Sequence, residues 1–543
     1  MSQDIAISPG YLLLIAPAAM LLIAALPAAL AARRPVAMGR LVQGAAVAGL
    51  AATLAAALWA EFAAPSLPST LVVAGRDAGS LPLALSVLAD RLTFTILGLV
   101  ALLATIIARY STNYLAGEAE QGRFFRWLAL TLGAFMLVVM AGNLLMFVIA
   151  VVVTGTGLNR LLTHYRERLP AQMVAHKKLL FSRVADGCLL AAALLLAAGG
   201  GDVSFEGIAA TAAASGGDLD WQFHLAAWLI VAYTILKSGQ FPFHGWLLQV
   251  MEAPTPVSAL LHAGIVYSGA IAVLRTHELL LADGHALIAL AVVGLVTAVV
   301  ASLAMLTQTA IKSSLAWSTA GQLGFMLLEL GLGLFVLAVL HLIAHSLYKA
   351  HAFLSSGSMV DVLRSPKARS RRTVGPAVWA GAVALGVPMT FAMGAAWGIT
   401  LANESALLAI GTIVAVAVAQ LLLTGWTTTA PVLRLLLVSL LVTVLYFGLH
   451  TLFAGFYSGV LRPIPQQVPA GQYVLLGLVA ALFLGLSFFQ AVLINRPPAP
   501  WLLRVYVHLY NGLYTDLPVE RLVYRVWPAR FRDLPGRRGR LKP

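Results

Sequence analysis

Apolar stretches of about 20 residues without a single charge recur along this chain, and they decide which folds it can adopt. Residues 11–32, 127–153 and 473–494 are three examples. A membrane-spanning helix needs about 20 apolar residues, and helices satisfy their own backbone hydrogen bonds in lipid. Hydrophobic residues make up 60% of the sequence and charged residues 10%. The pattern predicts an all-α polytopic membrane protein with about 13–15 transmembrane helices.

The distribution of charge predicts how the chain is oriented in a membrane. Its net charge is +14, but the basic residues lie in loops and in the tail, which argues against a nucleic-acid partner. Three basic segments, 164–183, 364–373 and 530–542, are expected on the cytoplasmic side by the positive-inside rule. We therefore expect a membrane protein whose N-terminus lies outside and whose C-terminus is cytoplasmic. We expect membrane lipid to surround the apolar spans of this chain as one of its partners.

Two further features limit the chemistry of the chain. Cys188 is the single cysteine, so no disulfide can form within the chain and a thiolate metal site is not expected. The first apolar run, from Tyr11, has no basic residue before it and is interpreted as a retained span instead of a signal peptide.

Titratable residues interrupt one of the most apolar regions. Lys237, Glu252 and His262 lie within residues 237–264. Ionisable groups inside a membrane are costly and usually mark an ion or proton path, although an interfacial anchor is the alternative for Lys237. Glycine and proline around residues 238–243 and again around 385–394 predict two interrupted helices, or else two simple kinks.

A second titratable group follows in the chain. His341, His345 and Lys349 are spaced four residues apart, which places them on one face of a helix. Lys312 opens the preceding helix, and His351 follows closely. Such a stripe should face protein or water because it would be costly in lipid. We expect these groups to exchange protons near the bilayer midplane.

Several of these segments resemble the antiporter-like subunits of respiratory complex I and of multisubunit sodium/proton antiporters. The resemblance is carried by "KSGQFPFHGWLLQVMEAPTPVSALLHAG", "IKSSLAWSTAGQLGFM" and "HLIAHSLYKAHAFLSSGS", and it extends over about residues 90–360. It implies two inverted five-helix repeats, each with an interrupted helix, and a polar axis that moves protons. The implied ion-pathway residues are Lys237, His262, Lys312, His345 and Lys349, with Glu252, His341 and His351 as further candidates.

The resemblance also suggests how the chain is divided. We expect N-terminal transmembrane helices in residues 1–89, a first repeat in 90–280, a second repeat in 281–430, C-terminal transmembrane helices in 431–495, and a basic amphipathic cytoplasmic tail in 496–543.

Two departures from the respiratory members stand out. Val151 and Val152 occupy the place of a Trp-Glu pair, so the glutamate that would pair with Lys237 is expected to be missing. Residues 386–401 contain no lysine, where respiratory subunits typically have one. A complete path of the respiratory type is therefore not expected.

In these losses and in its compact length, the chain is most similar to the DabB family, the membrane subunits of two-component inorganic-carbon pumps. The similarity implies a place in the bacterial inner membrane, with the N-terminus in the periplasm. It also implies a cytoplasmic, zinc-containing DabA-like partner that hydrates CO2 to bicarbonate. A cation would drive this reaction, with H+ expected and Na+ as the alternative. This chain has no zinc constellation, so we expect a transporter subunit without a catalytic site or cofactor of its own. The alternatives are a proton-pumping subunit of a respiratory or antiporter complex, and a membrane scaffold without ion conduction.

The C-terminal segment 501–531 interleaves aromatic and arginine residues. These types are enriched at protein interfaces, and the aromatics equally at the lipid headgroups. Docking of a partner and anchoring in the interface are thus both open. The candidate docking residues are Arg504, Tyr510, Arg521, Arg525 and Trp527.

Overall fold

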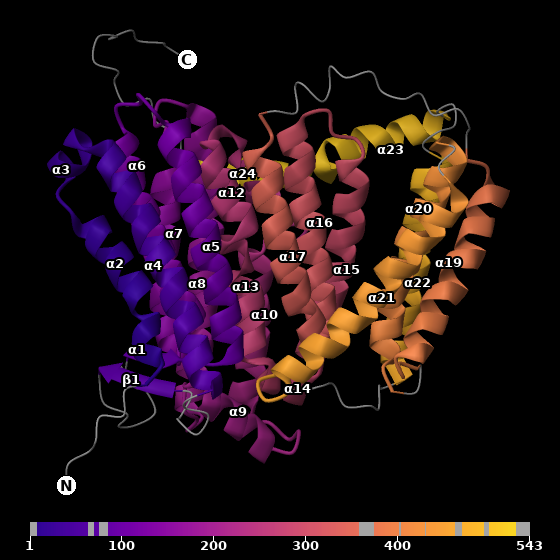
Figure 1. Ribbon diagram of the computed structural model, residues 1–543, viewed down its shortest axis with the longest axis horizontal. Helices are drawn as coiled ribbons and strands as arrows, with labels where there is room; N and C mark the ends of the chain where they lie inside the picture. The colour runs from indigo at the N-terminus through magenta and orange to yellow at the C-terminus, as the bar shows by residue number, and fades with distance from the viewer. Residues whose placement is uncertain are drawn as a thin grey trace. The chain divides into compact units, whose positions relative to one another are not determined.

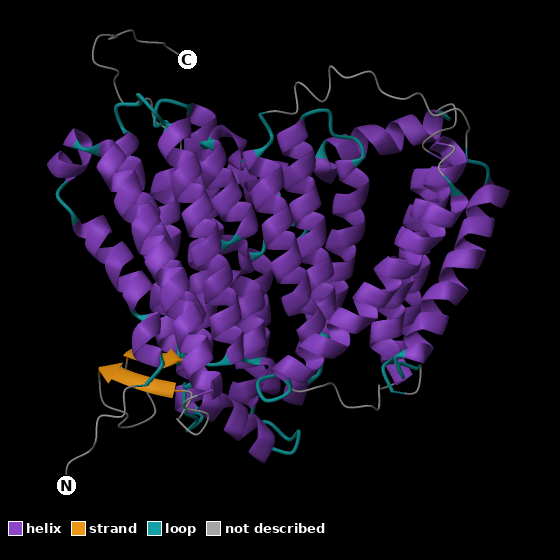
Figure 2. Ribbon diagram, viewed as in Figure 1, coloured by secondary structure: helices purple, strands orange, loops and turns teal. Residues whose placement is uncertain are grey.

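The computed structural model describes a helical membrane protein (Figures 1 and 2). The described residues are 8–62, 70–74, 85–357, 374–400, 403–428, 431–461, 470–493 and 499–527. Within them, twelve helices are long and apolar enough to cross a membrane, and Gly10–Ala25 is a shorter apolar helix. A two-stranded antiparallel sheet joins β1 (Thr70–Ala74) to β2 (Leu85–Leu88). The predicted all-α membrane fold is confirmed.

The chain packs into two compact units. Unit 1 comprises Met1–Ala282, His345–Leu354 and Tyr514–Pro543. Its helices are α1 (Gly10–Leu13), α2 (Ile15–Ala25), α3 (Ala28–Arg33), α4 (Pro35–Phe62), α5 (Arg91–Tyr114), α6 (Gln121–Met140), α7 (Leu144–Leu162), α8 (Leu169–Ala198), α9 (Phe205–Ala214), α10 (Trp221–Lys237), α11 (Gly245–Leu248), η1 (Val250–Glu252), α12 (Thr255–Ala263), η2 (Ile265–Tyr267), α13 (Ser268–Arg275), α14 (His277–Asp283) and α24 (Asp516–Val526).

Unit 2 comprises Asp283–Ala344 and Ser355–Leu513. Its helices are α15 (His285–Met305), α16 (Ile311–Gly331), α19 (Pro376–Ala396), α20 (Ser405–Thr428), α21 (Val432–Tyr457), α22 (Ala470–Phe488), η3 (Phe489–Leu493) and α23 (Pro500–Tyr510), followed by η4 (Gly512–Tyr514). Helix α17 (Phe335–Leu354) has residues in both units. The predicted repeat and segment boundaries stay predictions.

Polar side chains cap the starts of α5 and α7 in unit 1. The Asp90 carboxylate accepts a hydrogen bond from Thr93 N at 2.7 Å and starts α5. It also pairs with the guanidinium of Arg275 at 2.6 Å, which ties α5 to the end of α13. The Asn143 side chain caps α7 by accepting from Met146 N at 2.7 Å. A capping side chain typically contributes about 1 kcal/mol.

The predicted interruption after Lys237 is present. Helix α10 ends at Lys237, and Gly239 follows with φ +58°, a left-handed conformation that favours glycine. A second break comes at Gly264, before the short helix η2. The breaks leave buried polar atoms such as Ser238 Oγ without a hydrogen-bond partner in the described part of the chain. Irregular backbone at this depth is tolerated where it lines a water-filled space.

The predicted second interruption, around residues 385–394, is wrong. Helix α19 runs continuously from Pro376 to Ala396 with Pro388 inside it. The Thr390 hydroxyl donates a hydrogen bond to Gly386 O at 2.9 Å, in the turn that contains the proline. Hydroxyl side chains of this kind help a membrane helix to accommodate proline.

In unit 2, α15 and α16 pack closely. A Cβ at Gly324 would lie 2.7 Å from Gly294 O, so both glycines permit backbone contact. The ends of α16, α17, α20, α21 and α22 share one apolar core, which includes Leu328, Leu407 and Phe447. The basic segments 364–373 and 530–542 lie outside the described residues.

Candidate functional site

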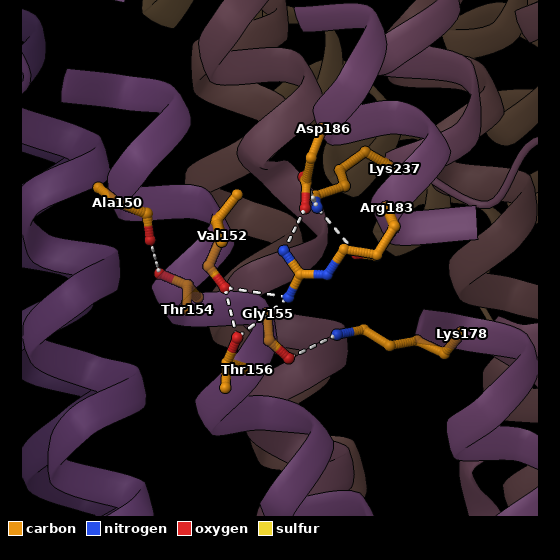
Figure 3. Close-up of polar contacts among 10 residues, drawn as sticks. Ala150, Val152, Thr154, Gly155, Thr156, Lys178, Arg183, Asp186 and Lys237 are labelled. Atoms are coloured by element: carbon orange, nitrogen blue, oxygen red, sulfur yellow. Dashed lines mark hydrogen bonds and ion pairs between the residues drawn. The ribbon is translucent and has the colours of Figure 1, made fainter. Parts of the chain in front are cut away.

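A buried ion pair joins α8 and α10 in unit 1 (Figure 3). Lys237 Nζ donates to Asp186 Oδ1 at 2.6 Å and to Ser182 Oγ at 2.8 Å. The two charged side chains are only 9% and 6% exposed. A charge removed from water must be paired and hydrogen bonded, and here both conditions are met.

The glutamate is absent from α7, as expected, but Lys237 nevertheless has a carboxylate partner. The partner comes from α8, at Asp186, instead of from α7. On α7, the backbone carbonyl of Val152 accepts from Arg183 Nη2 at 3.4 Å, and the Thr156 hydroxyl accepts from the same nitrogen at 3.0 Å. Arg183 Nη1 reaches Asp186 Oδ2 at 3.1 Å. One carboxylate thus holds two cations (Figure 3).

Lys178 is a further buried cation that the sequence analysis did not single out. Its Nζ donates to Gly155 O on α7 at 3.1 Å, and the residue is 5% exposed. Lys178, Ser182 and Asp186 follow at intervals of four along α8, so they share one face of this helix. That spacing is the signal in "HKKLLFSRVAD" that could have revealed them.

Lys178, Ser182 and Lys237 border a small cavity. It holds about 20 Å³ of space for water, enough for about one molecule. Lys178, Lys237 and Trp246 are part of its wall. Trp246 Nε1 has no hydrogen-bond partner among the residues described. Leu261 and Val266, the chain neighbours of His262 and Tyr267, also line it.

Three of the predicted residues come together beside the second helix break. The Tyr267 hydroxyl lies 2.6 Å from His345 Nδ1 and 3.3 Å from His262 O. The His262 ring stacks on Phe353 with centroids 4.5 Å apart. Lys349 is fully buried, and its charge acts on His262. His262 and His345 thus meet at the Tyr267 hydroxyl, and Lys349 follows His345 by one helical turn on α17.

The other predicted pathway residues lie elsewhere. Glu252 pairs with Arg168 at 3.3 Å, with side chains 42% and 51% exposed, so it belongs to a surface pair and not to the Lys237 network. His351 is exposed. Lys312 is half-buried at the start of α16 in unit 2. His341 also belongs to unit 2, where its ring contacts Glu329.

The tail is attached to unit 1 through α24. Lys177 is fully buried, and its Nζ donates to Asp516 Oδ2 at 2.5 Å and to Gln249 Oε1 at 2.9 Å. The Trp527 ring stacks on His176 at 4.2 Å. Arg504, Tyr510, Arg521 and Arg525 are exposed. Trp527 thus serves a contact within the chain, while the basic side chains of α24 point to solvent.

No group of three or more His, Cys, Asp or Glu side chains suited to a metal ion occurs in the described ranges.

Family comparisons agree with this arrangement. Residues 141–378 match the family NADH:quinone oxidoreductase/Mrp antiporter, TM, and residues 76–125 match the N-terminus of complex I chain 5. The chain is similar in fold to a chain of the Mrp complex from Dietzia sp. DQ12-45-1b, with a TM-score of 0.54 and 22% identity, covering 95% of this chain and 57% of that one. The archaeal membrane-bound sulfane sulfur reductase gives a TM-score of 0.53 at 15% identity, covering 93% of this chain and 99% of that one.

Sequence identity to inorganic carbon transporter subunits is higher, and it extends over most of the chain. "Probable inorganic carbon transporter subunit DabB2" of Halothiobacillus neapolitanus is 48% identical, over 88% of this chain and 89% of the relative. "Probable inorganic carbon transporter subunit DabB" of Hydrogenovibrio crunogenus is 36% identical, over 81% and 83%. NADH-quinone oxidoreductase subunit L of Escherichia coli is 33% identical over 52% of this chain and 46% of that relative. With its antiporter-like helices and these relatives, the chain belongs to the DabB family of inorganic carbon transporter subunits.

Proposed function

We propose that this chain is the cation-conducting membrane subunit of an energy-coupled inorganic-carbon pump. The cation is the proton, with Na+ as the alternative. Its flow drives CO2 hydration by a cytoplasmic partner that contains zinc. The observation that carries the proposal is the buried network in which Asp186 holds both Lys237 and Arg183, next to Lys178 and a cavity that admits water. The names of the DabB relatives supply the substrate class.

The network is suited to moving charge because its members are coupled in a low-dielectric environment. An additional positive charge in the cavity next to Lys178 would weaken the hold of Lys237 on its own proton. Asp186 keeps a partner in Arg183 while Lys237 releases that proton. Lys237 can therefore change its charge without leaving a carboxylate unpaired.

The group around Tyr267 supplies further exchangeable sites. Its hydroxyl contacts His345 Nδ1, and a hydroxyl can accept one proton while it donates another. Leu261 and Val266, which precede His262 and Tyr267 in the chain, line the cavity beside Lys237, so this group comes next in the proposed path. Protons arriving at the cavity would pass toward His345 and Lys349 on α17.

The partner would bind on the cytoplasmic side, where the basic segments 164–183 and 364–373 and the tail are expected. The partner would hold the zinc that supplies the hydration chemistry. This chain supplies the ion path and the docking surface. It thereby couples cation flow to the hydration on the partner. The wider family also contains respiratory subunits, but the subunit L relative covers 52% of this chain against 88% for the carbon transporter subunit.

A bacterial strain deleted for its carbonic anhydrases tests the proposal. This chain and the product of its neighbouring gene, expressed together, should restore growth at ambient CO2, and either one alone should not. Uptake of radiolabelled inorganic carbon should stop when the proton and sodium gradients are collapsed. Uptake that survives the loss of both gradients would contradict coupling to a cation. A co-purified partner without zinc would contradict the assigned division of labour.

A further inference from the structure

Unit 2 contains a buried carboxylate that the network around Asp186 does not use. Glu329 lies in the last turn of α16 and is 2% exposed. Its Oε2 lies 2.9 Å from His341 Nδ1, and Gln322 Oε1 lies 2.9 Å from His341 Nε2. An oxygen therefore lies within hydrogen-bond distance of each ring nitrogen.

A second histidine–carboxylate pair lies in the same unit. His450 Nε2 on α21 is 3.4 Å from Glu404 Oε2, with side chains 10% and 42% exposed. His450 Nδ1 is buried and has no hydrogen-bond partner in the part of the chain that is described. This ring therefore has one nitrogen on a carboxylate and one nitrogen that faces inward, available to water or to a proton.

Tyr446 lies within electrostatic range of both pairs. It lies one helical turn before His450 on α21, on the same face. Its hydroxyl donates to Leu407 O at 3.4 Å, and the charges of Glu329 and Glu404 both act on it. Tyr446 packs against the apolar core that also contains Leu328, the neighbour of Glu329. The two pairs and Tyr446 are called the outer cluster (Glu329, His341, Glu404, His450 and Tyr446).

The order of the helices places the outer cluster at the ends of α17 and α19 that lie farther along the chain from residues 364–373. Helices α17 and α19 flank residues 364–373, and each is long enough to cross the membrane. Glu329 and His341 lie near the other end of α17, next to the α16–α17 connection. Glu404 immediately precedes α20, at the far end of α19. All three therefore lie on the side opposite the segment expected in the cytoplasm.

The two carboxylates of the outer cluster differ in exposure, and the two histidines have values between them. Glu329 is 2% exposed, His341 12%, His450 10% and Glu404 42%. A carboxylate open to solvent at one end and a fully buried carboxylate at the other is the arrangement expected of an entry path. Buried ionisable groups in membrane helices are costly, so a fully buried Glu329 without a role in charge movement would be a burden on stability.

We propose that the outer cluster is the proton entry of this chain, on the non-cytoplasmic side, and that it takes the place of the lysine absent from residues 386–401. A proton protonates the Glu404 carboxylate and moves to His450, which becomes an imidazolium as Glu404 returns to the carboxylate. Tyr446 and water carry the proton on to Glu329 and His341. The inference rests on the proposed function.

Substitutions of the buried and exposed carboxylates test this path in the complex with its partner. Uptake of radiolabelled inorganic carbon is measured in the carbonic-anhydrase-deficient strain, with membrane abundance measured in parallel. Glu329→Gln removes the titration but keeps the shape, and it should reduce uptake roughly tenfold or more. Glu329→Asp should restore part of it. Glu206→Gln, at an exposed carboxylate that hydrogen bonds Thr70, is the matched control and should leave uptake unchanged.

Glu404→Gln is the second variant because its half-exposed side chain can be changed with little loss of packing. It should change the dependence of uptake on external pH, which a purely structural role would not do. Normal uptake and a normal pH profile in Glu404→Gln would overturn the entry path, as would normal uptake in Glu329→Gln. Absence of uptake in the wild type and in Glu206→Gln alike would instead refute the carbon-pump function itself.

Discussion

Lys237 on α10 and Asp186 on α8 form an ion pair of 2.6 Å across 51 residues of sequence, in an environment from which water is largely excluded. The pair stands at the centre of the proposed ion path, and its burial makes the loss of either charge costly. Removing one partner of a buried pair leaves an uncompensated charge, whereas removing both charges does not.

Asp186→Asn should abolish carbon uptake and destabilise the protein by about 3–5 kcal/mol. The double variant Asp186→Asn with Lys237→Met should recover much of this stability but no uptake. Thermal unfolding in detergent and the uptake assay measure the two effects. A double variant that is as active as the wild type would show that the pair is only structural.

Tyr267→Phe should lower uptake while the protein remains in the membrane, because it removes the hydroxyl that contacts His345 Nδ1. The loss of one relay group is expected to cost roughly tenfold or more in rate. Tyr348→Phe is the matched control, since Tyr348 is 58% exposed on α17. Equal uptake in both variants would remove Tyr267 from the path.

Arg521→Glu with Arg525→Glu should reduce co-purification of the cytoplasmic partner, because both side chains are exposed on α24 while the opposite side of the helix holds Lys177. Arginine is among the residues that dominate protein interfaces. Arg40→Glu, an exposed arginine on α4, is the control. Partner recovery that is unchanged even after deletion of residues 501–543 would assign docking to the basic segments 164–183, which includes the start of α8, and 364–373.

Acidic pH should destabilise the loop between α7 and α8. Burial lowers the pKa of His164 below its ordinary value of 6.5, and the hydrogen bond to Glu118 opposes this only in part. The unfolded chain therefore binds a proton at His164 before the folded protein does, so stability is lost as pH falls below about 6.5. Between about pH 7.5 and pH 5.5 the melting temperature should fall less in His164→Gln than in the wild type. Parallel curves would contradict this assignment.

The sequence by itself determined the features that depend on local composition. Spans are visible because lipid demands about 20 apolar residues in a row, and this is a one-dimensional property. The break after Lys237 was predictable from "SGQFPF", since glycine and proline act on their own backbone. The candidates His262, His345 and Lys349 stood out because titratable residues are rare in such surroundings.

Tertiary structure alone decided which charges meet. On α7, the position where the sequence pattern places the partner of Lys237 is occupied by Val152. The packing of α8 against α10 brings Asp186 to Lys237 instead. Packing likewise separated Glu252 from Lys237 and placed His341 beside Glu329. Pro388 was compatible with both a broken and a continuous helix. Ion pairs between helices depend on rotation and register in three dimensions, and apolar spans of similar composition leave these open until the side chains pack.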